Sequence, residues 1–292
     1  MGGFDQIQWT MCSNDNHRER CDQIIQTFRT HGTKSSFYNA ESISGLRYSV
    51  LLDLPYFDPV RYCVVDPMHN LFLGTGKRMM KVWLKLPDNV MRKNLDQIES
   101  LISEFTILEG IGRLPSKISS HFGGFTADQW RNWITIYSPI VLWQVLRQQQ
   151  WNCWILFVQA VKMITGRVLG VTELSEADVL LQKFCRLTKE LYGDRACTIN
   201  MHMHLHLMQS LQDFGPTNAF WLYSFERYNG ILGSFHTNNV RIESQIMQRF
   251  LETESLGSEV RNLLDEQFLN VLPKDSQLYD AAELNVNSQM LM

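Results

Sequence analysis

Apolar residues recur at helical spacing along most of the chain after Pro67. The helices predicted from this pattern lie near 67–86, 90–106, 126–148, 151–169, 175–192, 200–214, 217–233 and 240–268. Glycine or proline stands at the breaks between them, for example at Pro87, Gly170 and Gly193. The pattern therefore predicts a mainly α protein with little room for a sheet.

The two ends of the chain lack this periodicity. Residues 1–45 are polar and weakly periodic, and we expect a poorly structured remnant or linker there. Leu46–Val65 is apolar but punctuated by prolines, which favours short extended pieces or turns. The sequence thus predicts a helical region over 46–270 and a flexible tail over 271–292.

Composition narrows the class of protein. Of the 292 residues 45% are apolar and 20% charged, as in ordinary soluble globular proteins. The net charge of −3 gives no overall basic field, although a local patch could still bind nucleic acid. The most apolar stretch, Ile134–Val161, contains Pro139 and Arg147, so we expect no membrane span. Six cysteines without a CxxC pair predict isolated buried thiols in a reducing, intracellular compartment.

The first candidate for chemistry is the string VVDPMHNLFLG. Asp66 followed by Pro67 is typical of a helix start, because the carboxylate accepts from free N–H groups and proline suits the first helical position. Capping does not account for His69, one turn further on. A carboxylate and an imidazole at this spacing can also share a metal ion. Both interpretations remain open from spacing alone.

The second candidate is NMHMHLHLMQSLQDFGP. On a helix, His202, His206, Gln209 and Asp213 form one narrow polar strip between two apolar arcs. Such a helix is largely enclosed, so its imidazoles need hydrogen-bond partners or a metal ion. His204 projects among apolar residues instead, which favours a satisfied core histidine.

The third candidate is AFWLYSFERYNGILGSF. Phe220, Phe225 and Tyr228 belong to a broad apolar face, and Glu226 points the opposite way. Two glycines, Gly230 and Gly233, share the acidic face at a helix-destabilising cost of roughly 1 kcal/mol each. They suggest that something approaches closely, such as a divalent ion with a phosphodiester. The alternative is a solvated Glu with glycines that ease helix packing.

A basic stripe precedes Pro87. Lys77, Lys81 and Lys85, with Arg78 beside them, lie opposite apolar residues of the same predicted helix. A stripe of this kind is either a solvated helix face or a set of phosphate contacts.

Taken in this order, these segments resemble the transposase domain of CACTA-type (EnSpm) DNA transposons. The similarity covers about residues 15–255 and rests on several long strings in the right sequence. The matching strings are GLRYSVLLDLPYFDPVRYCVVDPMHNLFLGTGK, NMHMHLHL, GPTNAFWLYSFERYNGILG and NNVRIESQIMQRFL.

The resemblance implies an RNase H-like core with three catalytic carboxylates (a DDE triad), interrupted by a helical insertion before the last one. The third catalytic acid of the family falls on Glu226, with Glu243 the less favoured candidate. Both catalytic aspartates of the family lie upstream of the segment that starts near Gly45. We therefore expect a C-terminal fragment: the insertion and the terminal catalytic helix, with most of the sheet missing.

The resemblance also implies a metal site. The D-x-x-H string of the family falls on Asp66 and His69, and its paired histidines fall on His202 and His206. In the related V(D)J recombinase a comparable Cys/His set binds zinc. We therefore expect these four residues to converge on one structural Zn²⁺ site.

The expected function is that of a fragment of a cut-and-paste transposase, which in its complete form cleaves and transfers DNA strands with Mg²⁺ or Mn²⁺. The isolated chain should be inactive. Its partner would be DNA at the transposon ends, in the nucleus, with homo-oligomerisation left open and no membrane involved. The alternatives are a domesticated, zinc-stabilised DNA- or protein-binding module without catalysis, and a pseudogene product.

Overall fold

The structure is a computed structural model that describes residues 12–31, 33–88, 90–105, 114, 118, 122–166, 168–238 and 240–255. Every regular element in these residues is helical, so the predicted mainly α class is confirmed for this part of the chain. The chain divides into two compact units, one ending at Leu222 and the other starting at Tyr223. The boundary between the units falls inside 46–270, which the sequence predicted as one helical region. The tail 271–292 lies outside the described residues.

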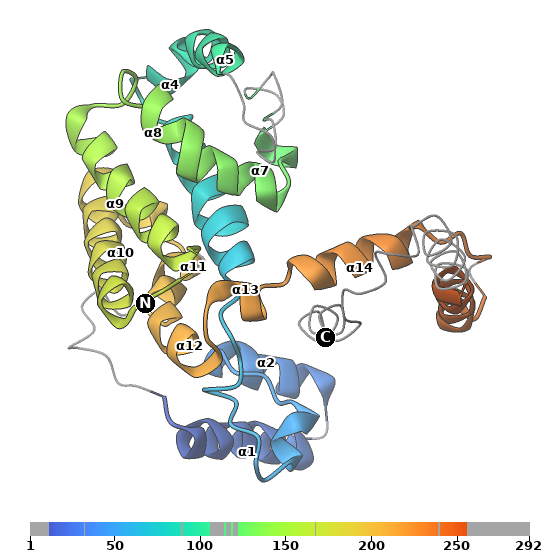
Figure 1. The fold of residues 1–292 in the computed structure, drawn as a ribbon. Coiled ribbons are helices and arrows are strands. Elements are labelled where there is room, and N and C mark those ends of the chain that lie inside the picture. The colour runs from blue at the N-terminus through green and yellow to red at the C-terminus, as the bar shows by residue number, and fades with distance from the viewer. Residues whose placement is uncertain are drawn as a thin grey trace, which may run out of the picture. The chain divides into compact units, whose positions relative to one another are not determined.

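Two helices occupy the region where the sequence predicted a poorly structured remnant. They are α1 (Asn14–His31) and α2 (Lys34–Ser44), which pack against each other (Figure 1). The Arg18 guanidinium donates to the carbonyls of Leu52 (2.5 Å) and Leu54 (3.0 Å), which fastens α1 to the turn that follows. The expectation failed because α1 has few apolar residues and is positioned largely by these polar contacts, which leave no periodic signal in the sequence.

The segment predicted as one helix over 67–86 begins as a wider π-helix. This part, η3 (Met68–Gly76), continues directly into α3 (Lys77–Trp83). Close packing surrounds its glycines. A Cβ on Gly74 would lie 2.7 Å from the His69 carbonyl and would also meet the Asn200 side chain. A Cβ on Gly76 would lie 2.5 Å from Cδ1 of Ile134. The two glycines therefore allow η3 to pack tightly against the 199–204 and 133–137 segments.

The core of the larger unit is aromatic. The long helices α9 (Gln148–Ile164) and α10 (Val171–Tyr192) lie side by side (Figure 1). Trp154 is fully buried between Trp83 and Phe157, with ring centroids 5.0 and 5.1 Å away. Its indole nitrogen donates to the Ser138 hydroxyl at 2.8 Å. These contacts bury large side chains and leave the Trp154 N–H satisfied.

Three of the six cysteines follow the expectation of buried thiols. Cys21, Cys153 and Cys185 are buried, whereas Cys12 and Cys63 are exposed and Cys197 is intermediate. All six are free. Burial raises the pKa of Cys153 to about 11 and raises that of Cys185 further, so both thiols stay protonated at neutral pH. The prediction of burial was wrong for Cys12 and Cys63, which are exposed.

The predicted helices over 200–214 and 217–233 are each interrupted. The first consists of α11 (Ile199–His204) and α12 (Leu207–Phe214), with a turn at Leu205–His206. The second consists of α13 (Thr217–Phe220) and α14 (Tyr223–Ser234), separated by Trp221 in an extended conformation. Gly215 lies between the pairs at φ 85°, a conformation that favours glycine.

The remaining elements are short. They are η2 (Val50–Asp53), α4 (Val90–Lys93), α5 (Leu95–Glu104), η4 (Phe122–Gly124), α7 (Ala127–Asn132), η5 (Trp133–Tyr137), α8 (Ser138–Val141), η6 (Asp194–Ala196) and a helix over 242–255. No described helix is both long and apolar enough to cross a membrane.

Candidate functional site

The strip of polar residues predicted from the histidine-rich string lines one cavity of the larger unit. His202, His206, Gln209 and Asp213 all face a cavity of about 740 Å³. The other walls come from the start of α1 and from residues 59–65. The strip survives the turn at Leu205–His206 because both short helices present the same side to the cavity.

His202 and His206 form a close pair in this cavity. Their Nε2 atoms lie 3.4 Å apart, and the rings meet edge to face. Burial is the main cause that lowers the pKa of each, and the charge of His202 lowers that of His206 further. Both imidazoles are therefore neutral at pH 7, the state in which a ring nitrogen can bind a metal ion.

This geometry fits two ligands of one zinc ion. Two nitrogens bound to a tetrahedral zinc at about 2.0–2.1 Å lie about 3.3–3.4 Å from each other. The Nε2 separation of 3.4 Å has this value. A structural zinc site needs further ligands, usually four in total.

The other predicted pair, Asp66 and His69, lies at the start of η3. Asp66 accepts from the backbone N–H of His69 at 2.9 Å and from that of Leu222 at 3.1 Å, and its Oδ2 lies 2.6 Å from Nδ1 of His69. Asp66 thus caps the helix, as the first interpretation predicted, and ties it to the end of the larger unit.

The two pairs are not assembled into one cluster in the described part of the chain. There, no group of three or more His, Cys, Asp or Glu side chains is close enough to hold a metal ion. The two elements do touch, because the Asn70 amide donates to the Asn200 carbonyl at 3.0 Å. The shared four-ligand site stays a prediction, with the His202–His206 pair as the half whose geometry fits.

Sequence reasoning missed other residues of the cavity. His17 and the exposed thiol of Cys63 line it, and Arg61 makes two hydrogen bonds to Asp213, one of them 3.0 Å long. The hydrogen bonds from Arg61 lower the pKa of Asp213. Asp213 was on the predicted strip, but nothing in the sequence pairs it with a residue more than 150 positions away.

His204 belongs to the core, as predicted. Its ring is fully buried and stacks on Phe157 at 5.6 Å. Nε2 shares a hydrogen bond of 2.8 Å with the Thr75 hydroxyl. Burial lowers the pKa of His204 to about 3, so this histidine is neutral and structural.

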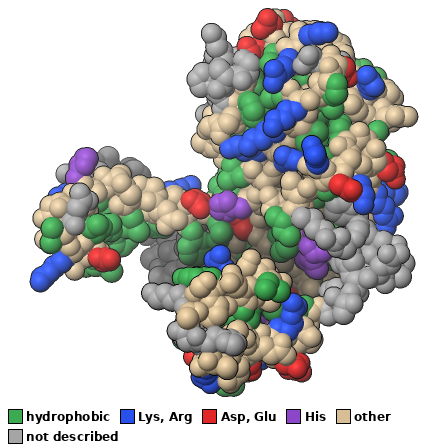
Figure 2. All heavy atoms as spheres, turned by 180° about the vertical axis from the view of Figure 1, so that it is seen from behind, with side chains coloured by type: hydrophobic (Ala, Val, Ile, Leu, Met, Phe, Trp, Pro, Cys, Tyr) green, Lys and Arg blue, Asp and Glu red, His purple; other side chains and the backbone are tan. Residues whose placement is uncertain are grey.

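The predicted basic stripe divides into two pairs. Lys77 donates to the Gly123 carbonyl at 2.7 Å, and Arg78 donates to the carbonyls of Ala196 (3.3 Å) and Arg195. Lys81 and Lys85 are exposed instead. Figure 2 shows Lys and Arg side chains gathered on the upper part of the larger unit. Lys81 and Lys85 are therefore the members of the stripe placed to contact a ligand.

Glu226 belongs to the smaller unit. It lies on α14 and is exposed. A Cβ added to Gly230 or Gly233 would meet nothing within 4 Å, so no close neighbour in the described residues requires these glycines. α14 contains no buried residue, and Phe225, Tyr228 and Ile231 of its predicted apolar face are 67%, 49% and 37% exposed.

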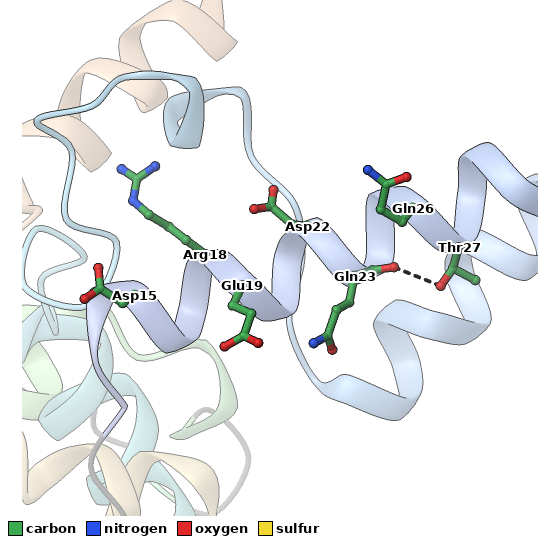
Figure 3. A pocket seen from close by; sticks show the side chains of 7 residues that line it. All are labelled: Asp15, Arg18, Glu19, Asp22, Gln23, Gln26 and Thr27. Atoms are coloured by element: carbon green, nitrogen blue, oxygen red, sulfur yellow. Dashed lines mark hydrogen bonds between the residues drawn. The ribbon is translucent and has the colours of Figure 1, made fainter.

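A second hollow of similar volume runs along α1. All seven residues that line it, from Asp15 to Thr27, belong to this one helix, and Figure 3 shows their side chains spread along it. Arg18 is engaged with backbone carbonyls, and the Thr27 hydroxyl donates to the Gln23 carbonyl at 2.9 Å. Because the polar groups do not converge, this hollow has no features of a site.

No protein-family model, curated protein sequence or solved structure matches the chain. The resemblance to CACTA-type transposases is carried by the sequence strings alone.

Proposed function

We propose that this chain is the helical insertion and terminal catalytic helix of a CACTA-type cut-and-paste DNA transposase, inactive in DNA cleavage by itself. In the complete enzyme Glu226 would be one of three carboxylates that hold Mg²⁺ or Mn²⁺ at the DNA. The metal ions, when bound, stabilise charge on the attacking and leaving oxygens.

The observation that carries this proposal is the exposed apolar face of α14. Phe225 and Tyr228 are 67% and 49% exposed, although a helix with a continuous apolar face normally buries it. A sheet supplied by an upstream segment would cover this face and would bring two aspartates with it. Glu226, on the opposite face, would stay uncovered and accessible to a metal ion at the DNA.

Lys81, on α3, and Lys85, in the turn after it, would give the chain a contact for DNA. Lys81 and Lys85 are exposed and one helical turn apart, a spacing at which both ammonium groups can contact backbone phosphates. This is the second support for the proposal.

The test compares the chain alone with a version extended upstream by the reading frame that encodes the two aspartates. With Mn²⁺ and terminal-repeat DNA, the chain alone should give no nicking. The extended chain should nick, and Glu226→Gln should abolish this activity while Glu243→Gln leaves it. Nicking by the chain alone that Glu226→Gln removes, or nicking by the extended chain that Glu226→Gln leaves unchanged, contradicts the proposal.

A second candidate function is a zinc-stabilised DNA- or protein-binding module without catalysis. The close His202–His206 pair favours it, since a bound Zn²⁺ would stabilise the turn between α11 and α12. Metal analysis of the purified chain should find about one zinc, and chelation should lower the melting temperature. His202→Ala with His206→Ala should remove the metal, whereas His236→Ala, an exposed histidine of the smaller unit, should not. A chain without zinc after purification in zinc-containing buffer contradicts this candidate.

A further inference from the structure

Two hollows flank the exposed lysines Lys81, on α3, and Lys85, in the turn after it. One, of about 600 Å³, is lined by Arg78 and Arg195 on its charged side; the other, of about 400 Å³, is lined by Arg92 and Phe122. Lys81 and Lys85 line both. Each charged side chain among the described residues of the two linings is Lys or Arg. Lys81, Lys85 and the arginines of the two linings therefore form one cationic surface, the cationic track, that spans both hollows.

Lys77 and Arg78, the members of the stripe that bind backbone carbonyls, position other residues of this track. Arg78 binds the carbonyls of Arg195 and Ala196 and so fixes η6, from which the exposed Arg195 side chain reaches the first hollow. Lys77 binds the Gly123 carbonyl and so fixes the 122–124 turn beside α3. That turn places Phe122 in the second hollow. Both contacts position groups from distant parts of the chain next to Lys81 and Lys85.

The second hollow is partly apolar. Leu84, Leu95 and Phe122 line it together with three cationic groups. The Phe122 ring is partly exposed and is braced edge-on by Trp130 at 6.5 Å. An aromatic ring between cationic side chains is the arrangement that stacks on a nucleobase while the cations contact the backbone. Only an unpaired base can enter such a hollow, because the bases of a duplex are stacked on one another.

We propose that α3 and the 122–124 turn bind single-stranded DNA, with Lys81 and Lys85 against the phosphates and Phe122 stacked on an unpaired base. This inference rests on the proposed DNA-binding function. It adds that the surface prefers single-stranded DNA to duplex DNA. The cationic track accounts for affinity, and the Phe122 hollow accounts for preference of single strand over duplex.

The experiment measures fluorescence anisotropy of a labelled oligothymidylate and of a labelled duplex with the full 292-residue chain. Wild type should bind the single strand more tightly. Phe122→Leu should weaken single-strand binding about 5- to 100-fold, the loss expected for one stacked base. It should leave duplex binding and the salt dependence unchanged. The control Tyr56→Leu changes an aromatic residue that is 73% exposed and outside both hollows, and should have no effect.

A second variant separates this inference from the proposed function. Lys81→Ala with Lys85→Ala should weaken both DNA forms and lower the slope of log K against log salt by about 1.4 for the single strand. The matched double variant Lys162→Ala with Lys183→Ala removes two exposed lysines of α9 and α10. It should change neither the affinity for the two DNA forms nor the salt dependence.

The outcomes are distinguishable. If the lysine variant weakens binding but Phe122→Leu, shown folded by circular dichroism, binds the single strand like wild type, the single-strand inference is overturned and the DNA-binding function stands. An equal loss for both DNA forms in Phe122→Leu also overturns it. If the lysine variant binds both forms like wild type, the DNA-binding function itself fails.

Discussion

The helices α10 and α14 show how differently the two units are stabilised. α10, in the larger unit, buries six residues that include Leu181, Phe184 and Cys185. α14, in the smaller unit, buries none and leaves Phe225 67% exposed. Both helices are amphipathic, so the difference lies in what covers the apolar face. The larger unit contains its own core, whereas the apolar face of α14 is left exposed.

The largest effect is expected when one aromatic residue in each unit is truncated. Trp154→Ala removes a fully buried indole and should cost about 3–5 kcal/mol of unfolding free energy. Phe225→Ala removes an exposed ring and should change it by less than about 0.5 kcal/mol. Urea denaturation followed by tryptophan fluorescence measures both. Equal losses would mean that the Phe225 ring is buried in the protein in solution.

The next effect is the pH dependence of the unfolding free energy that comes from His204. Its folded-state pKa of about 3 lies below the ordinary histidine value of 6.5, so the unfolded chain binds the extra proton first as pH falls. The contribution of the neutral ring is fully present above pH 6.5 and is lost toward about 3, at up to about 1.4 kcal/mol per pH unit. Unfolding free energies near pH 7 and pH 5 should differ by about 2 kcal/mol more in wild type than in His204→Gln. The same pH dependence in both proteins would show that His204 does not titrate on unfolding.

The last prediction compares two glycines, for which we expect effects of opposite sign. Gly74→Ala should cost about 1–3 kcal/mol, because a Cβ there would lie 2.7 Å from the His69 carbonyl. Gly230→Ala, on α14, meets open space and should instead stabilise the helix by about 0.5–1 kcal/mol. Thermal unfolding of the two variants shows the opposite signs. Destabilisation by Gly230→Ala would indicate a close neighbour on the acidic face of α14, as the sequence suggested.

Much of the fold was predictable because its signal is local. Apolar periodicity located most helices after Pro67, and the same 100° rotation per residue put His202, His206, Gln209 and Asp213 on one strip, which lines one cavity. The burial of His204 followed from the apolar residues around it in the same string.

What could not be predicted depends on contacts between distant segments. α1 is fastened by Arg18 to carbonyls more than 30 residues away, and a backbone acceptor leaves no trace in the sequence. The close packing of η3 depends on how Gly74 and Gly76 meet other elements. Likewise the role of Phe122 appears only when Lys77 brings its turn beside α3. Periodicity indicates which face is apolar but not which distant segment covers it.

The buried thiols allow the opening of the core to be followed by chemical modification. Since only a thiolate reacts with alkylating reagents, Cys153 and Cys185 are silent while the core is closed. Cys12 and Cys63, at the surface, react at once. Cys21, on α1, is buried too, so it is the slow modification of Cys153 and Cys185 that reports how often α9 and α10 separate. Mass spectrometry of that modification reports the lifetime of the native core under the same buffer used for DNA binding.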